Sequence, residues 1–138
     1  MDDKMTITFL GTGTSQGIPV IGSNHPVCLS KDPKDKRLRV SVLISWKNYN
    51  YVIDCGPDFR QQIADEDRYP GAPAVKVHNV SKDEKIPLGD LDVVPIEAFH
   101  NRLQVFGYRF GEFVYMTDVK RVEEEEIKKK KGAKVLVV

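Results

Sequence analysis

Short runs of β-branched, aliphatic and aromatic residues, each bounded by turn-forming residues, recur along this chain of 138 residues. Such runs predict β-strands rather than long helices, because glycine, proline and short polar residues interrupt the pattern every few positions. We expect strands at residues 6–10, 39–46, 49–54, 74–80, 91–97, 105–110, 113–117 and 135–138. Lys47-Asn48 and Gly111-Glu112 are the expected turns of two hairpins. The chain is therefore predicted to be dominated by strands.

Two helices are expected between these strands. Pro57 suits a first helical turn and predicts a short helix over residues 57–63. Over residues 122–131, glutamates precede lysines by four positions, which stabilises a helix and favours a solvated charged face ended by Gly132. The expected pairs are Glu124 with Lys128, Glu125 with Lys129 and Glu126 with Lys130.

The 21 basic and 20 acidic residues nearly cancel, leaving a formal net charge of +1, and 41% of the residues are apolar. This balance is typical of one compact soluble domain and argues against nucleic acid as a partner. The chain has no apolar run long enough for a bilayer and no signal-peptide pattern, so no membrane association and a cytoplasmic location are expected. Two cysteines, Cys28 and Cys55, are too few for a disulfide scaffold and fit the same reducing compartment.

A glycine-rich stretch, GTGTSQG at residues 11–17, follows the first predicted strand. Its G-x-G-x-x-x-G spacing differs from the dinucleotide-binding pattern, and no Gly-Lys-Ser/Thr follows to form a phosphate-binding loop. We interpret it as a tight turn that opens a long loop extending to Arg37.

His25 and Cys28 lie three residues apart in that loop and could share a zinc ion. A structural zinc site needs four ligands, and no second Cys-x-x-Cys or His-x-x-x-His pair follows. The pair is therefore a weak structural-zinc candidate, and a loop histidine beside a buried thiol is the simpler alternative.

Three polar residues stand at the ends of predicted strands. Asp54 follows an apolar strand just before a Gly-Pro break, and it could instead simply accept hydrogen bonds from the turn. His100 and Asp118 each close a strand of what is expected to be one sheet. A histidine and an acid brought together suit a metal ion or general acid-base chemistry, although each alone would be an ordinary residue at a strand terminus.

Several strings of the sequence together resemble a known family. The strings that carry the resemblance are TFLGTGTSQGIPVIG at 8–22, KRLR at 36–39, IDCGPDFR at 53–60, HNRL at 100–103, GYR at 107–109 and YMTD at 115–118. In this order they are similar to metallo-β-lactamase-fold hydrolases, with the phosphonate-pathway cyclic phosphodiesterase group as the closest resemblance.

The resemblance implies a site with two metal ions, zinc or manganese. His100 would be a metal ligand, Asp118 would bridge the two metals, and Asp54 would be a structural acid that supports the site. The expected reaction is hydrolysis of a phosphodiester or related ester of a small-molecule or nucleotide-like substrate, with a metal-bound hydroxide as the nucleophile.

The sequence also departs from the family. The His-x-His-x-Asp-His block expected after Gln62 is absent, and the chain contains only three histidines. Ser23 and His25 occupy positions where some members have cysteines and only Cys28 remains, so the additional structural zinc site is expected to be absent or weak. We therefore expect a single domain over residues 1–138 with an internal deletion near 62–66 and a truncated C-terminus.

The predicted fold is a β-rich α/β domain, an incomplete version of the metallo-β-lactamase αββα sandwich. A metal-dependent hydrolase is one functional hypothesis, and for the sequence as it stands a catalytically inactive fragment or binding module, holding no metal, is the other. A shortened chain would expose apolar surface, so a homodimer is a further expectation.

Overall fold

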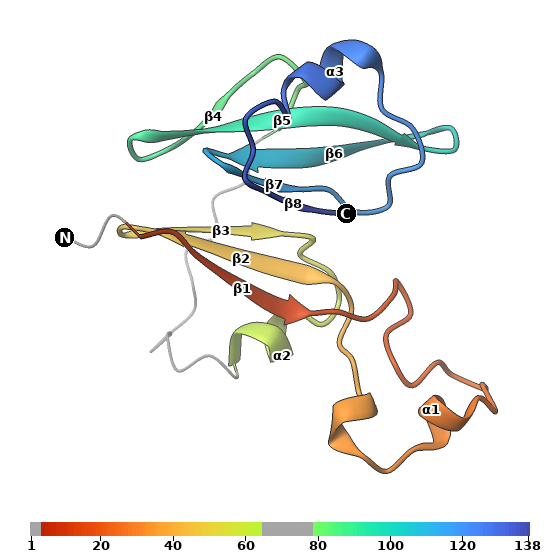
Figure 1. The fold of residues 1–138 in the computed structure, drawn as a ribbon. Coiled ribbons are helices and arrows are strands. Elements are labelled where there is room, and N and C mark those ends of the chain that lie inside the picture. The colour runs from red at the N-terminus through yellow and green to blue at the C-terminus, as the bar shows by residue number, and fades with distance from the viewer. Residues whose placement is uncertain (1–3, 65–78) are drawn as a thin grey trace. The chain divides into compact units, whose positions relative to one another are not determined.

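The structure, a computed structural model, describes residues 4–64 and 79–138. Backbone contacts divide the chain into two compact units, Met1–Val75 and Lys76–Val138, and each has its own β-sheet (Figure 1). A single domain over residues 1–138 was expected from the sequence. That the two units form one domain stays a prediction. Within the described ranges, no helix is long and apolar enough to cross a membrane.

The first unit is built on an antiparallel sheet with the order β1-β2-β3. The strands are β1 (Thr6–Gly11), β2 (Ser41–Trp46) and β3 (Tyr49–Ile53), and each was predicted. β2 and β3 form the expected hairpin, in which Lys47 adopts the left-handed φ of 53° that a tight turn requires. Four consecutive residues of β2, 41–44, are buried, so this central strand contributes most to the core of the unit.

The long loop after β1 contains two short helices that were not expected from the sequence. These are α1 (Pro26–Leu29) and a 3-10 helix (Pro33–Asp35), each of which begins with a proline. His25 Nδ1 accepts a hydrogen bond from the Val27 N–H at 3.3 Å and so caps α1. A single helical turn is too short to show a period of 3.6 residues, which explains why only a loop was expected.

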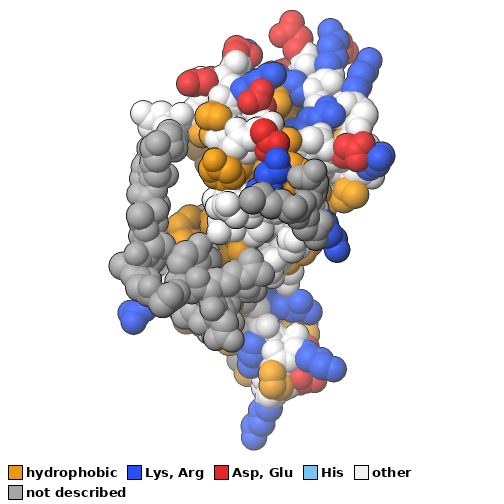
Figure 2. All heavy atoms as spheres, turned by 90° about the vertical axis from the view of Figure 1, so that its left-hand side faces the viewer, with side chains coloured by type: hydrophobic (Ala, Val, Ile, Leu, Met, Phe, Trp, Pro, Cys, Tyr) orange, Lys and Arg blue, Asp and Glu red, His pale blue; other side chains and the backbone are white. Residues whose placement is uncertain are grey.

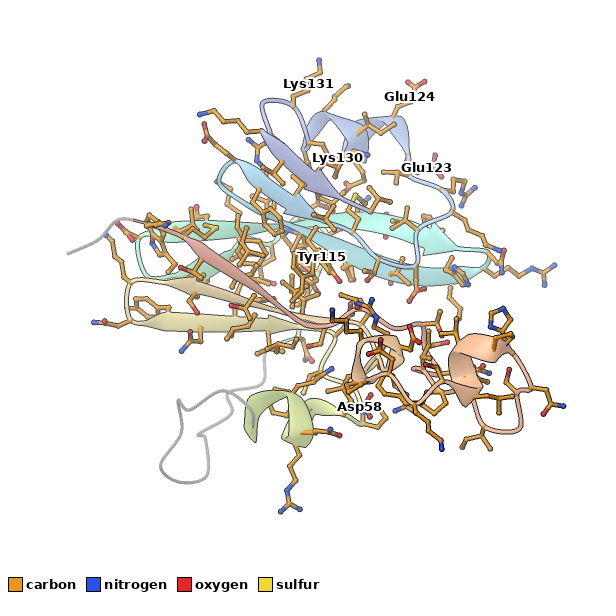
Figure 3. The ribbon with its side chains drawn as sticks, turned by 60° about the horizontal axis from the view of Figure 1, so that its bottom comes forward. Asp58, Tyr115, Glu123, Glu124, Lys130 and Lys131 are labelled. Atoms are coloured by element: carbon orange, nitrogen blue, oxygen red, sulfur yellow. The ribbon has the colours of Figure 1, made fainter. Side chains whose placement is uncertain are left out.

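The predicted short helix is α2 (Phe59–Ala64). Gln62 is buried, and its Nε2 donates to the Arg39 carbonyl at 2.8 Å. Asp58 lies just before the helix (Figure 3). It accepts hydrogen bonds from the Arg39 N–H and guanidinium at 2.8 and 2.6 Å. These contacts attach α2 to the segment that enters β2. The strand predicted at 74–80 lies mostly outside the described residues, and Asn79 and Val80 have no strand conformation.

The second unit is built on a sheet with the order β4-β5-β6-β7-β8. Its strands are β4 (Ile86–Leu88), β5 (Leu91–His100), β6 (Leu103–Phe110), β7 (Phe113–Tyr115) and β8 (Val135–Val137). Neighbouring strands are antiparallel except β7 and β8, which are parallel and are connected through α3 (Glu124–Lys128). The core cluster consists of Ile96, Ala98, Val114 and Met116. β4 was not predicted because it is only three residues long and contains a proline.

The edge of β5 that faces away from β6 is covered by three different partners. β4 pairs with residues 91–93. Further along, Glu126 Oε2 accepts from the Glu97 N–H at 2.7 Å, and Lys129 Nζ donates to the Pro95 carbonyl at 3.3 Å. Near the strand end, the Phe99 N–H donates to a backbone carbonyl of the segment that precedes α3. Pro95 is tolerated in this strand because no neighbouring strand needs its missing N–H.

The charged stretch around α3 corrects one expectation. Glu126 was predicted to be solvated and paired with Lys130, but it is only 4% exposed and its carboxylate lies 2.8 Å from Lys129 Nζ. Glu124 and Lys131 do point away from the sheet, and acidic and basic side chains are mixed over this end of the molecule (Figures 2 and 3). The helix is also shorter than the predicted 122–131. Its charged face is therefore solvated on the outside, while Glu126 completes the hydrogen bonding of β5.

Candidate metal centre

His100 is the last residue of β5 and pairs with Leu103 across the tip of the β5–β6 hairpin. Its Nδ1 is buried and has no hydrogen-bond partner within the described part of the chain. Buried polar atoms are nearly always paired, so an orphaned imidazole nitrogen calls for an explanation. A nitrogen in this condition is suited to bind a metal ion or to exchange a proton.

Asp118 lies in the segment between β7 and α3, and this segment is attached to the end of β5. The Phe99 N–H donates to the Arg121 carbonyl at 2.8 Å, and the Lys120 and Arg121 N–H groups donate to the Phe99 carbonyl at 2.9 and 3.1 Å. Figure 1 shows this connection passing beside the β5–β6 hairpin. The structure therefore brings the segment that carries Asp118 next to the strand end that carries His100. β5 and β7 belong to one sheet, as expected, and the roles of His100 and Asp118 as metal ligands stay predictions.

Positive φ values occur at or beside each of the three candidate residues. Asp54, Asn101 and Asp118 have φ values of 62°, 57° and 54°, and Lys47 in its hairpin turn is the other non-glycine residue of this kind in the described ranges. Asp and Asn tolerate the left-handed region better than other residues, but the conformation still costs energy. Backbone strain of this sort is commonly retained where a side chain must be aimed at a site.

Asp54 lies in the first unit, directly after β3, where its carbonyl accepts a hydrogen bond from the Gly56 N–H at 2.9 Å. Asp54 is exposed and makes interactions with its surroundings. The turn geometry agrees with the simpler interpretation of a strand-end aspartate, and the role of Asp54 in supporting a metal loop stays a prediction.

The donor types agree with a zinc or manganese ion, but their number falls short of a complete site. The unpartnered His100 Nδ1 and the Asp118 carboxylate are a suitable nitrogen and oxygen pair. In residues 4–64 and 79–138, however, no three His, Cys, Asp or Glu side chains are grouped as metal ligands. The remaining histidine, His78, lies outside the described residues. Two ligands alone bind a metal weakly, so a stable centre requires further donors.

His25 and Cys28 lie in the loop that contains α1, and the structure gives each a local partner. His25 uses Nδ1 to cap the helix, and its backbone N–H donates to Ser23 Oγ at 3.2 Å. Hydrogen bonds from the Val20 backbone and the Ser23 hydroxyl, with a smaller contribution from the Lys36 ammonium, lower the pKa of the Cys28 thiol. These contacts account for the pair without a metal, and structural zinc binding at this loop stays a weak prediction.

The lowered pKa of Cys28 gives a direct prediction. In a Cys55→Ser background, alkylation of Cys28 by iodoacetamide is expected to reach half-maximal rate at a lower pH in the folded protein than in urea, because the thiolate is the reactive form. Ser23→Ala should move this midpoint to higher pH. Ser30→Ala is the matched control, since Ser30 Oγ accepts from the Asp32 N–H in the same loop and is not among the groups that lower the pKa of Cys28. Equal midpoints for folded and unfolded protein would contradict the assignment.

The glycine-rich stretch at residues 11–17 owes its glycines to close packing of the backbone. The Gly13 N–H donates to the Leu38 carbonyl at 2.8 Å, and a Cβ on Gly13 would lie 2.7 Å from that oxygen. A Cβ on Gly11 would overlap the Arg39 carbonyl and approach Gln62 Nε2. The stretch is thus a turn held against the segment that enters β2, as the sequence predicted.

Three residues near His100 received no individual role from the sequence: Asn101, Lys120 and Arg121. Asn101 carried a usable signal, because asparagine is a preferred residue for a left-handed turn position. Lys120 and Arg121 carried none, since they come next to Phe99 only through tertiary hydrogen bonds.

The profile of the β-lactamase superfamily domain matches residues 63–138, which is more than half of the chain. The chain belongs to the β-lactamase superfamily. The match includes the whole second unit, with both His100 and Asp118.

A curated relative of this superfamily chain is an octanoyltransferase from Porphyromonas gingivalis (strain ATCC BAA-308 / W83), 30% identical over 190 positions. The alignment includes 97% of this chain and 39% of the relative, so the chain spans about two fifths of the length of that protein. Because the chain has 138 residues, at least 52 of those positions (190 minus 138) have no residue of this chain opposite them. The internal deletion near residues 62–66 stays a prediction.

Solved structures that are similar to this superfamily chain include a diphosphatase and a zinc-bound protein. A diphosphatase from the PhnP family matches with a TM-score of 0.84 and 28% identity, over 96% of this chain and 73% of the other. Zinc-bound PqqB from Methylobacterium extorquens matches with a TM-score of 0.73 and 14% identity, over 96% and 71%, a likeness that concerns the fold alone. The predicted α/β fold of the metallo-β-lactamase type is confirmed, as is the resemblance to the phosphonate-pathway phosphodiesterase group.

Proposed function

We propose that this chain is part of a metal-dependent hydrolase that cleaves phosphodiesters or related phosphate esters. The observation that carries the proposal is the unpartnered His100 Nδ1 beside the segment that holds Asp118. The superfamily match and the similarity to a diphosphatase support a hydrolase and favour a phosphate-containing substrate. A cytoplasmic location, proposed from the sequence, agrees with the two free cysteines.

His100 and Asp118 would hold the metal, zinc or manganese, together with donors that the described residues do not provide. When bound, such an ion supplies acidity to a coordinated water and withdraws negative charge from a phosphoryl oxygen. The contribution of this chain is positioning. The hydrogen bonds between Phe99 and residues 120–121 fix the segment after Asp118, and the left-handed turn at Asn101 fixes the hairpin after His100.

The proposal predicts that the chain takes up zinc or manganese and hydrolyses bis(p-nitrophenyl) phosphate, and that Asp118→Ala lowers both by at least about tenfold. The loss is expected because one ligand of an already incomplete set is removed. Metal content after gel filtration and the release of p-nitrophenol are the two measurements. Asp92→Ala, an exposed aspartate at the other end of β5, is the control and should change neither. Absence of metal uptake by the unsubstituted chain would exclude the proposal.

A non-catalytic binding module is the second candidate. It is favoured by the lack of a three-ligand group in the described ranges and by the alignment positions that this chain does not fill. Hydrolysis that requires added metal and stops with a chelator would rule it out. A folded chain with no turnover at any metal concentration would support it.

A further inference from the structure

Basic side chains cluster around the end of β5, beside the two candidate ligands. Arg102 lies in the hairpin turn after His100, and Lys120 and Arg121 follow Asp118 in the adjacent segment. All three are exposed. They belong to the second unit, so their arrangement depends only on contacts within it.

Two of these three residues, Lys120 and Arg121, are held in place by backbone hydrogen bonds. The N–H groups of Lys120 and Arg121 both donate to the Phe99 carbonyl, which fixes their Cα positions relative to the end of the strand. Lys120 Nζ then donates to Asn101 Oδ1 at 3.2 Å, directly beside His100 in sequence. The ammonium group is therefore directed toward the hairpin turn that carries His100.

The three cations differ in how far they are neutralised. Arg121 lies over the Phe99 ring at 4.7 Å and its Nε is 3.4 Å from the Glu123 carboxylate. Lys120 contacts a neutral amide oxygen, and neither Lys120 nor Arg102 has an ion-pair partner among the described residues. By contrast, Lys129 and Lys134 each lie within 2.9 Å of a glutamate oxygen. The end of β5 thus presents two cations without carboxylate partners.

We propose that Lys120 and Arg102 bind the oxygens of a phosphate group on the substrate, next to the phosphorus that is attacked, as in a diphosphate or a nucleotide-like ester. The inference rests on the proposed function, and it names the substrate class and the residues that select it. Lysine and arginine are the usual partners of phosphate oxygens, since charge-assisted hydrogen bonds are the strongest available to them. A substrate with an uncharged substituent would not use these cations and would be bound less tightly.

The test measures binding without turnover. The full 138-residue chain, freed of metal by a chelator that is then removed, is titrated with inorganic pyrophosphate and followed by amide chemical shifts. The expected changes concentrate at residues 100–102 and 118–121, and added salt should weaken them. Lys120→Met and Arg102→Met should each raise the Kd at least about fivefold, a size typical of one charge-assisted contact. Lys128→Met, an exposed lysine on α3, is the matched control and should leave the Kd unchanged.

The outcomes separate this inference from the proposed function. No pyrophosphate binding, or equal Kd values for the Lys120→Met variant and the unsubstituted chain, would overturn the inference even if metal-dependent hydrolysis is observed. Binding that depends on Lys120 and Arg102, in a chain that takes up no metal, would keep the phosphate site and reject the hydrolase. Circular dichroism of each variant shows that any loss of binding is not due to unfolding.

Discussion

Replacing Gly11 with alanine is expected to lower the free energy of unfolding by about 3 kcal/mol or more. The added Cβ would overlap the Arg39 carbonyl and lie 2.9 Å from Gln62 Nε2. Neither group can move freely, because the Arg39 carbonyl accepts a hydrogen bond from Gln62, which is buried. Urea denaturation followed by fluorescence is a suitable measurement, since the single tryptophan, Trp46, lies in β2 of the same unit.

Gly56→Ala is the control for the Gly11 substitution. A Cβ on Gly56 meets no atom within 4 Å, and its φ lies outside the left-handed region. Its effect should stay within about 0.5 kcal/mol. If Gly11→Ala costs no more than Gly56→Ala, the close approach between β1 and the Arg39 backbone is wrong.

Replacing Glu126 with alanine is expected to lower the free energy of unfolding by about 2–4 kcal/mol. The substitution leaves the Glu97 N–H without its acceptor at 2.7 Å and removes the carboxylate 2.8 Å from Lys129 Nζ. Glu126→Gln should cost less, because its amide oxygen can still accept from the Glu97 N–H. Thermal denaturation followed by circular dichroism measures both.

Glu125→Ala serves as the comparison for Glu126. Glu125 is the preceding residue of the same helix, but it is exposed, so its loss should change stability by no more than about 0.5 kcal/mol. Similar losses for the two alanine variants would show that Glu126 acts through helix propensity alone and has no role at the edge of β5.

Much of the fold could be predicted because strands and tight turns leave local signals. The hairpin at Lys47-Asn48 and the turn at Gly111 are examples, since each adopts the positive φ that such turns require. The position of His100 at the end of a strand could likewise be predicted from the alternation of apolar residues. Asp118 was expected to close a strand over 113–117, but β7 ends at Tyr115, so Asp118 lies in the connection that follows it. The expectation that the two segments belong to one sheet is confirmed, since β5 and β7 lie in the same five-stranded sheet.

The burial of Glu126 could not be predicted from local sequence. One of its partners, Glu97, lies 29 residues away. The other, Lys129, follows at i,i+3 and not at the expected i,i+4 spacing. The sequence shows an unbroken series of glutamates and lysines, and nothing distinguishes the inward-facing one. The same reason applies to Lys120, whose position depends on hydrogen bonds to Phe99 that form only in the folded unit. α1 is hidden for another reason, since its one turn depends on the His25 cap and not on a repeated pattern.

The edge of β5 that faces away from β6 has three different partners, and this has a consequence for hydrogen exchange and for aggregation. The amides of Glu97 and Phe99 are protected by different elements, a side chain of α3 and the backbone of residue 121, so they can exchange with deuterium independently. Local opening of α3 would release the Glu97 N–H and the Pro95 carbonyl without unfolding the sheet. The central part of β5 would then present a free strand edge to other chains, so α3 protects this part of the strand against edge-to-edge association.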